Sequence, residues 1–195
     1  MRVDIDRWDQ KYKDANPNPT FEPDPILVVN AVLLDGQGTA LDVACGVGHN
    51  AIFLAQRGYD VVAIDGSLSG LRYGRAVLQN TKLPVSLVVA DLEALSLPMD
   101  FFSLVLVVRY LYRPLIAQLK RALRPGGLII YKTFNVNYQR ERPAFHPDYL
   151  LEPGELATIF ADFELIATND SQHLVDSTTF WIGRRPAHVK HLSEN

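Results

Sequence analysis

A glycine turn between a short apolar run and a helix-forming run constrains this chain most. The apolar run is Thr39–Val43, the turn holds Gly46 and Gly48, and residues 50–57 have the pattern of a helix. Glycine allows a tight turn and a close approach of the backbone to a ligand. A strand, a glycine turn and a helix in this order are typical of nucleotide sites in α/β proteins. Asp42 ends the strand with a carboxylate, which disfavours a pyrophosphate and favours a positively charged ligand.

The rest of the chain alternates predicted strands and helices. We expect helices over 4–13, 25–34, 50–57, 67–80, 114–123 and 155–161, and strands over 39–43, 60–64, 85–89, 104–108, 128–132, 163–167 and 178–183. Near-continuous apolar strands indicate a parallel sheet buried on both faces, and the last two strands, with no helix between them, indicate an antiparallel pair. The expected fold is therefore a Rossmann-like, doubly wound α/β fold. Its seven-stranded sheet is mostly parallel, with a C-terminal antiparallel strand and helices on both faces.

The length of 195 residues fits a single domain. Within it we expect an N-terminal helical lid segment over 1–35, a Rossmann-like core over 36–185 and a mobile tail over 186–195. Four prolines make 14–25 a predicted loop, and Asp24 can cap the helix that begins at Pro25.

Charge and cysteine content narrow the function classes. The formal net charge is −3 and the basic clusters are short, so the chain is not expected to bind nucleic acid or an anionic membrane surface. Cys45 is the only cysteine, which excludes an intrachain disulfide and fits a cytoplasmic protein. No apolar run is long enough to cross a bilayer. The histidines lack metal-site spacing, so no metal is expected.

Several segments in order resemble the motifs of class I S-adenosylmethionine-dependent methyltransferases. They are the glycine turn 42–50, the strand end 61–67, Ala90-Asp91-Leu92, the strand 102–107 and the turn and strand 119–132. Trp8, Asp9 and Tyr12 resemble the N-terminal lid signature of small bacterial tellurite-resistance (TehB-like) proteins, and the chain is also similar to thiopurine methyltransferases. It departs from that group at His49, where arginine is usual, and at Lys132, where some members carry glutamate.

The resemblance implies S-adenosyl-L-methionine as cofactor, with S-adenosyl-L-homocysteine as product. This cofactor is an adenosine that carries an ammonium and a sulfonium, which fits the carboxylate of Asp42. Asp65, 19 positions after Gly46, stands where a carboxylate takes both ribose hydroxyls, and Asp91 can accept from the adenine amino group. The expected cofactor-binding residues are Asp42, Ala44, Gly46, Gly48, Asn50, Asp65, Gly66, Ser67, Asp91, Leu92, Val108, Trp8 and Tyr12.

The acceptor is expected at the carboxyl ends of the strands, where open α/β sheets bind ligands. The acceptor-side candidates are Arg109, Tyr110, Tyr12 and His49. The implied reaction is an in-line displacement at the sulfonium methyl, in which the protein mainly aligns the two partners. No general base stands out, which favours a small, soft or already ionised acceptor such as a thiol or an oxyanion of selenium or tellurium.

Three alternatives remain open from the residues alone. The segment Gly46, Gly48 and Ala51 also fits the fingerprint of an NAD-dependent oxidoreductase. A cofactor-binding subunit without catalysis would keep the same residues, and an RNA methyltransferase would need RNA contacts from a partner. The acceptor, the use of a general base, the oligomeric state and the pathway are not encoded in these motifs.

Overall fold

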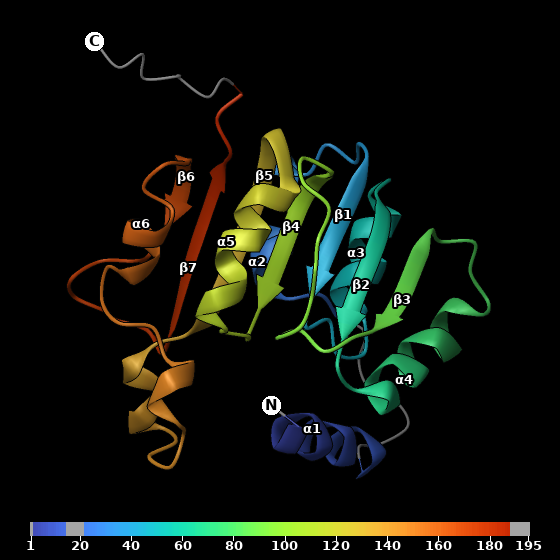
Figure 1. Ribbon diagram of the computed structural model, residues 1–195, viewed down its shortest axis with the longest axis horizontal. Helices are drawn as coiled ribbons and strands as arrows, with labels where there is room; N and C mark the ends of the chain where they lie inside the picture. Colours follow the sequence, from blue (N-terminus) through green and yellow to red (C-terminus); the bar gives the residue numbers. More distant parts are fainter. Residues whose placement is uncertain (1, 15–21, 188–195) are drawn as a thin grey trace.

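A seven-stranded sheet forms the centre of the molecule (Figure 1). The computed structural model describes residues 2–14 and 22–187. The strand order is β3-β2-β1-β4-β5-β7-β6. Strand β7 runs antiparallel to the other six strands, which all point in the same direction. The strands are β1 (Thr39–Val43), β2 (Asp60–Asp65), β3 (Val85–Val89), β4 (Phe102–Val108), β5 (Leu123–Phe134), β6 (Glu164–Thr168) and β7 (Thr178–Arg184). This arrangement confirms the predicted fold class.

The register of the parallel strands aligns their carboxyl ends. Val43 pairs with Ile64 of β2 and with Val107 of β4. The turns that follow these strands therefore leave the sheet at one common edge, where ligands of open α/β sheets bind.

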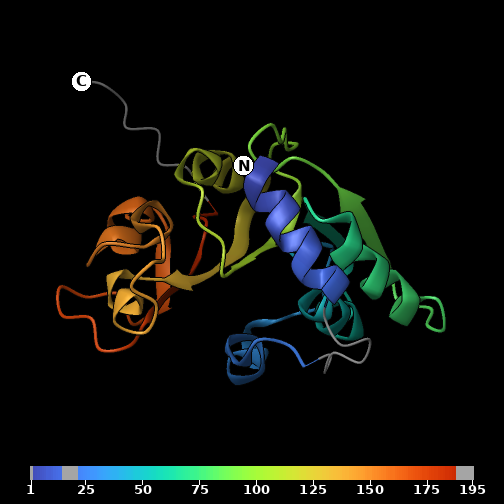
Figure 2. The ribbon, with the colours of Figure 1, turned by 90° about the horizontal axis from the view of Figure 1, so that it is seen from below.

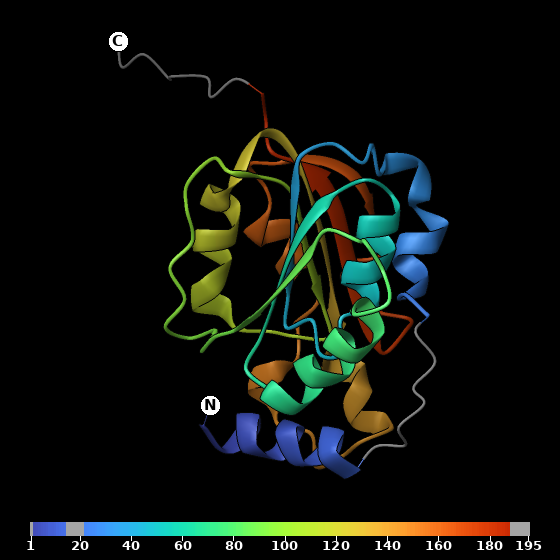
Figure 3. The same ribbon diagram turned by 90° about the vertical axis from the view of Figure 1, so that its right-hand side faces the viewer.

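Helices cover both faces of the sheet (Figures 2 and 3). One face carries α2 (Pro25–Val29), α3 (His49–Gln56) and α4 (Leu68–Leu78), and the other carries α5 (Arg113–Ala122) and α6 (Glu155–Ile159). Alternate strand residues feed two cores: Leu104 and Leu106 pack on the α3 face, while Val105 and Val107 pack on the α5 face. Burial on both faces explains the continuous apolar runs in the sequence.

Helix α1 (Arg2–Asp14) lies across the carboxyl edge of the sheet, beside α4 (Figure 1). Two short 3-10 helices, η2 (Val136–Arg140) and η3 (Pro147–Tyr149), follow β5 at the same edge. The edge predicted to bind ligands is therefore bordered by an N-terminal helix on one side and by the segment after β5 on the other.

Some element boundaries differ from the prediction. The helix expected over 25–34 ends at Val29, because Asn30 caps it and a 3-10 turn, η1 (Ala31–Leu33), follows. Asp24 does cap its start, since Asp24 Oδ1 accepts a hydrogen bond from the Ile26 amide at 3.0 Å. Strand β5 is longer than predicted, since it includes the turn at Gly126. The predicted tail over 186–195 and the loop over 14–25 lie largely outside the described residues.

Within residues 2–14 and 22–187, no helix combines the length and apolar character that crossing a membrane requires.

Candidate functional site

The turn after β1 has the tight backbone that its glycines predict. Gly46 and Gly48 have positive φ angles of 58° and 80°, and Ala44 has a φ of 56°. A positive φ at a residue other than glycine is uncommon and often marks a functional site. Gly48 is the N-cap of α3, and its amide donates to the Cys45 carbonyl at 2.9 Å. The turn therefore presents its backbone at the mouth of α3.

Asp42 lies buried beneath this turn. Its exposed fraction is 1%, and its Oδ2 atom has no hydrogen-bond partner in the described part of the chain. Burial, with the negative charge of Asp65 in second place, raises the pKa of Asp42 to about 8. A buried acceptor without a donor is rare, because such groups are nearly always hydrogen-bonded. The carboxyl is therefore suited to a ligand that brings a donor or a positive charge.

Asp65 connects the end of β2 to the turn. Asp65 Oδ2 accepts from the Gly46 amide at 2.7 Å, and Oδ1 accepts from the Ser67 amide at 2.7 Å. Burial raises the pKa of Asp65, although these amides counteract it. The carboxylate thus holds the glycine turn in place and lies at the edge where a ribose is expected.

The residues predicted to border the adenine lie after β2, β3 and β4. Asp91 is exposed, and its Oδ1 accepts from the Glu93 amide at 2.9 Å in a turn, while Leu92 is buried. Gly66 is approached by Ile5 of α1: a Cβ atom at Gly66 would lie 2.9 Å from Ile5 Cγ1. Val108 ends β4 and packs on the α3 face.

Helix α1 is fastened over the glycine turn. Asp9 Oδ1 accepts from Ser67 Oγ and from the Ser69 amide, both at 2.8 Å. The Tyr12 hydroxyl lies so close that a Cβ atom at Gly46 would be 2.5 Å from it. Burial and the charge of Asp65 raise the pKa of Tyr12 above its usual range. The predicted lid residues therefore lie on the predicted cofactor loop.

Trp8 takes a more peripheral position on α1. It is 41% exposed, and its ring lies 5.9 Å from that of Tyr12. Lys11 Nζ lies 4.1 Å from the centre of the Trp8 ring, in a cation–π contact.

A cluster of charged side chains lies beside the turn, at the ends of β4 and β5. Lys132 Nζ lies 2.7 Å from Asp24 Oδ1, and Arg109 Nη2 lies 3.8 Å from Asp24 Oδ2. Arg109 has a φ of 58°, in the left-handed region that is uncommon for residues other than glycine. Asn50 Oδ1 accepts from the Asp24 backbone amide at 2.8 Å, so the Asn50 side chain helps to hold Asp24 in the cluster.

His49 and Tyr110, both predicted to border the acceptor, lie in different places. The half-buried His49 has a buried Nδ1 atom without a partner in the described chain, and burial, helped by the charge of Arg109, lowers its pKa. Tyr110 packs against the core of the α5 face instead. The structure therefore brings Tyr12, His49 and Arg109 towards one site and leaves Tyr110 at its far side.

Sequence reasoning missed Asp24 and Lys132 as a pair and Asp9 as the fastening residue of α1. Asp24 was visible only as a helix cap, and nothing in the spacing of 108 residues links it to Lys132. Cys45 is buried as expected for a packing residue, and burial raises the pKa of its thiol.

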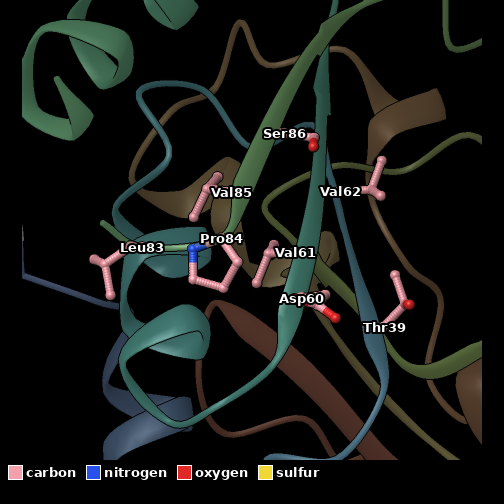
Figure 4. Close-up of a pocket in the computed structure, with 8 residues that line it drawn as sticks. All are labelled: Thr39, Asp60, Val61, Val62, Leu83, Pro84, Val85 and Ser86. Atoms are coloured by element: carbon pink, nitrogen blue, oxygen red, sulfur yellow. The ribbon is translucent and has the colours of Figure 1, made fainter. Parts of the chain in front are cut away.

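A pocket of about 360 Å³ lies at the amino ends of the strands, opposite to the edge that holds the glycine turn (Figure 4). It is lined by Thr39, Asp60, Val61, Val62, Leu83, Pro84, Val85 and Ser86, which include the first residues of β1, β2 and β3. It is therefore remote from the glycine turn. Among the described residues, no group of three or more His, Cys, Asp or Glu side chains is placed to hold a metal ion.

Sequence and fold point to the same group of proteins. Residues 40–127 match the family described as a methyltransferase domain. A solved S-adenosylmethionine-dependent methyltransferase from Mesorhizobium loti shares the fold of this chain, with a TM-score of 0.64 at 19% identity over 81% of this chain and 96% of that chain. The chain is therefore similar to methyltransferases in sequence over residues 40–127 and in fold over most of its length.

Individual relatives extend the comparison. Hemagglutinin 1 of Eikenella corrodens is 29% identical over 146 residues, which are 71% of this chain and 48% of the relative. The demethylmenaquinone methyltransferase of Renibacterium salmoninarum is 32% identical over 143 residues, 70% of this chain and 52% of the relative. The chain thus spans about half the length of these curated relatives.

A solved structure matches nearly the whole chain. It comes from work on the conversion of a disulfide bond into a thioacetal group during echinomycin biosynthesis. Its TM-score is 0.72 at 21% identity, and the match covers 95% of this chain and 94% of that chain.

Proposed function

We propose that this chain transfers the methyl group of S-adenosylmethionine to a small-molecule acceptor. The observation that carries the proposal is a pair of carboxyls next to the glycine turn, the buried Asp42 and the partly buried Asp65. Among the described residues, no lysine or arginine forms an ion pair with either one. A ligand with an ammonium and with ribose hydroxyls supplies the charge and the donors that this pair lacks.

The proposed roles follow from position. Asp42 faces the cofactor ammonium, the turn at Gly46 and Gly48 contacts the methionine part, and Asp65 takes the ribose hydroxyls. The remaining proposed cofactor contacts are Ala44, Asn50, Gly66, Ser67, Asp91, Leu92, Val108, Trp8 and Tyr12. Since Asp65 already binds the Gly46 and Ser67 amides, ribose binding is expected to share or replace those bonds.

The methyl group would move by in-line displacement. The sulfonium is already activated, so alignment supplies much of the rate, on the order of 7–11 kcal/mol in well-oriented systems. Tyr12 and α1 would exclude water from the reacting atoms. His49 directly follows the turn, and burial lowers the pKa of this half-buried side chain.

A soft acceptor, such as a thiol or an oxyanion of selenium or tellurium, agrees with the motif resemblance to tellurite-resistance and thiopurine methyltransferases. The solved neighbour from echinomycin biosynthesis is described by a conversion at sulfur. Likeness of fold does not separate acceptor classes, so the acceptor remains part of the proposal.

An NAD-dependent oxidoreductase is less compatible with these residues. Asp42 lies beneath the glycine turn, where a dinucleotide places its pyrophosphate, and a buried carboxylate there would repel it. Asp65 does not separate the two cofactors, because NAD proteins also bind ribose through a carboxylate at this position. A cofactor-binding subunit without catalysis would also bind the cofactor, so it differs only in turnover.

Calorimetric titration with S-adenosylhomocysteine, with NAD as the control, tests the proposal first. Binding of S-adenosylhomocysteine alone is expected. Transfer of a labelled methyl group from S-adenosylmethionine to a panel of thiols, thiopurines, selenite and tellurite then tests turnover. Binding of NAD alone would contradict the cofactor class, and binding without transfer to any acceptor would favour the non-catalytic subunit.

A further inference from the structure

We propose that the methyl acceptor is an organic anion with a flat body, bound in a pocket between α1 and the segment that follows β5. This inference rests on the proposed methyl transfer. It narrows the acceptor from any soft nucleophile to one that carries both a negative charge and an aromatic or unsaturated group.

The pocket is large enough for a metabolite. It measures about 550 Å³ and is lined by Arg7, Glu141, Arg142, Pro143, Ala144, Phe145, His146 and Tyr149. Volumes of about 300–1,000 Å³ are typical of small-molecule sites. An inorganic oxyanion such as tellurite would fill only a small part of this space. The size of the pocket therefore favours an organic acceptor.

The pocket lies at the reacting edge of the sheet. Arg7 belongs to α1, whose Tyr12 lies on the glycine turn, and the other lining residues belong to the segment after β5. Figure 1 shows α1 and this segment at the carboxyl edge of the strands. Arg109, at the end of β4, is close enough to both Lys11 and Tyr12 for its charge to act on them. An acceptor in the pocket would thus lie beside the cofactor loop.

Positive charge gathers around the pocket although the chain is acidic overall, with a net charge of −3. After burial, the charges of Arg109, Arg7 and Arg142 are what lower the pKa of Lys11. Glu141 is the one carboxylate among the residues that line the pocket, and across the described side chains of residues 5–14 and 22–187 no carboxylate lies within ion-pair distance of Lys11 or Arg142. Like charges repel one another unless an anion lies between them. The cluster is therefore arranged to bind a negative group.

Two aromatic side chains, Phe145 and Tyr149, line the pocket and belong to a larger aromatic cluster that forms one wall. The Phe145 ring meets Tyr138 edge-on at 5.0 Å and lies 6.3 Å from Tyr149. Phe134, at the end of β5, stacks on Tyr138 at 4.0 Å and fixes this wall to the sheet. Offset and edge-on aromatic packing is favourable for a flat ligand as well. The wall explains why the acceptor should be planar in addition to anionic.

The test uses probes of matched shape on the full chain saturated with S-adenosylhomocysteine. The probes are thiosalicylate, its neutral counterpart 2-mercaptobenzyl alcohol, and selenite as an inorganic anion. Calorimetry is expected to show that thiosalicylate binds at least tenfold more tightly than the other two. Arg142→Gln should weaken thiosalicylate binding about tenfold, because it removes a charge-assisted contact. Arg142→Lys should keep part of the affinity, and Arg140→Gln, on the same exposed segment but outside the pocket lining, should change nothing.

Three results would overturn the inference. They are equal binding of the neutral and the anionic probe, tighter binding of selenite, and unchanged thiosalicylate affinity in Arg142→Gln. Affinity for S-adenosylhomocysteine, measured in the same series, separates this failure from failure of the proposed function. Loss of thiosalicylate preference with intact S-adenosylhomocysteine binding concerns the acceptor only, whereas absent S-adenosylhomocysteine binding contradicts the methyltransferase proposal itself. Melting temperatures of the variants show that the exposed substitutions leave the fold intact.

Discussion

Asp24 and Lys132 form an ion pair that joins the start of α2 to the end of β5, with Lys132 Nζ 2.7 Å from Asp24 Oδ1. The exposed fractions of the two side chains are 1% for Asp24 and 18% for Lys132. The same Asp24 oxygen accepts from the Ile26 amide and so caps α2. One buried carboxylate therefore fixes the N-terminal segment to the sheet beside the candidate site.

The first prediction concerns this pair. Lys132→Met should lower the free energy of unfolding by about 3 kcal/mol, because it leaves the Asp24 carboxylate buried without its nearest cation. The double variant Asp24→Asn with Lys132→Met should recover part of that loss. Lys13→Met removes the exposed pair with Asp9 and is expected to cost less than about 1 kcal/mol. Urea unfolding of the variants gives these values, and equal losses in Lys132→Met and Lys13→Met would contradict the assignment.

The second prediction concerns the stability of the ligand-free protein against pH. The pKa of Asp42 is about 8 when folded, against an ordinary value of about 4 for the unfolded chain. The folded state thus holds a proton that the unfolded state has already released. The contribution of Asp42 is fully present below about pH 4 and is lost as pH rises towards 8, on the order of a few kcal/mol in total. Asp42→Asn should flatten this part of the unfolding profile, and Asp60→Asn, on an exposed strand start, should not.

The third prediction couples Asp42 to the cofactor. A cationic ammonium beside Asp42 favours its ionised form, so binding of S-adenosylhomocysteine at pH 7 should release a proton. Calorimetry in phosphate and in Tris should therefore give different apparent enthalpies for the wild-type chain. In Asp42→Asn this difference should vanish and the affinity should fall about tenfold or more. Identical enthalpies in both buffers for the wild-type chain would show that Asp42 does not face the ammonium.

The sequence was sufficient for those parts of the fold that depend on local pattern. The apolar runs of β1, β2, β4 and β5 and the glycine turn place these strands and the ligand edge without any long-range information, because burial on both faces demands such runs. Asp24 and Lys132 could not be paired in this way. Their contact depends on how α2 packs against the sheet, and neither residue type nor spacing encodes that packing.

In the candidate site too, some features follow from the local sequence pattern and others depend on packing between distant segments. Asp42 lies one residue before the end of β1 and Asp65 is the last residue of β2, so the position of both carboxylates at the carboxyl edge of the sheet follows from the strand pattern alone. The hydrogen bonds that Asp9 accepts from the Ser67 hydroxyl and the Ser69 amide do not follow from the sequence, because a polar residue on a short amphipathic helix is usually solvated. The pocket between α1 and the segment after β5 was not predicted either, since that segment has no periodic sequence pattern.

The fourth prediction concerns the fastening of α1. Asp9→Ala removes the acceptor for Ser67 Oγ and for the Ser69 amide, two charge-assisted contacts that hold α1 over the turn. Hydrogen exchange of α1 should become faster, and S-adenosylhomocysteine should dissociate about tenfold faster, as followed by tryptophan fluorescence. Asp14→Ala is the matched control, since within the described residues the Asp14 carboxylate accepts only from Gln10 of the same helix. Equal rates in Asp9→Ala and Asp14→Ala would mean that α1 does not gate the site.

The last prediction concerns the contact between α4 and the glycine turn. A Cβ atom at Gly74 would lie 2.5 Å from the carbonyl oxygen of Val47. Alanine is normally favoured over glycine inside a helix by about 1 kcal/mol, so helix propensity alone predicts that Gly74→Ala stabilises the protein. We expect the opposite, a loss of about 1–3 kcal/mol, because the added methyl group pushes against backbone that cannot move freely. The displaced Val47 peptide should also lower the affinity for S-adenosylhomocysteine about tenfold.

Gly74→Ala is expected to lower both the stability and the affinity for S-adenosylhomocysteine, and Gly126→Ala separates these two effects. Gly126 has a φ of 77° and open space around its Cα, so alanine there meets backbone strain but no neighbouring atom. Its expected cost is about 1 kcal/mol, with unchanged affinity for S-adenosylhomocysteine, because the turn lies at the amino end of the strand and far from the ligand edge. Urea unfolding and calorimetry on both variants give the comparison. If Gly74→Ala were as stable as the wild-type chain, or bound S-adenosylhomocysteine equally well, the close packing of α4 on the turn would not be what holds the loop in its binding shape.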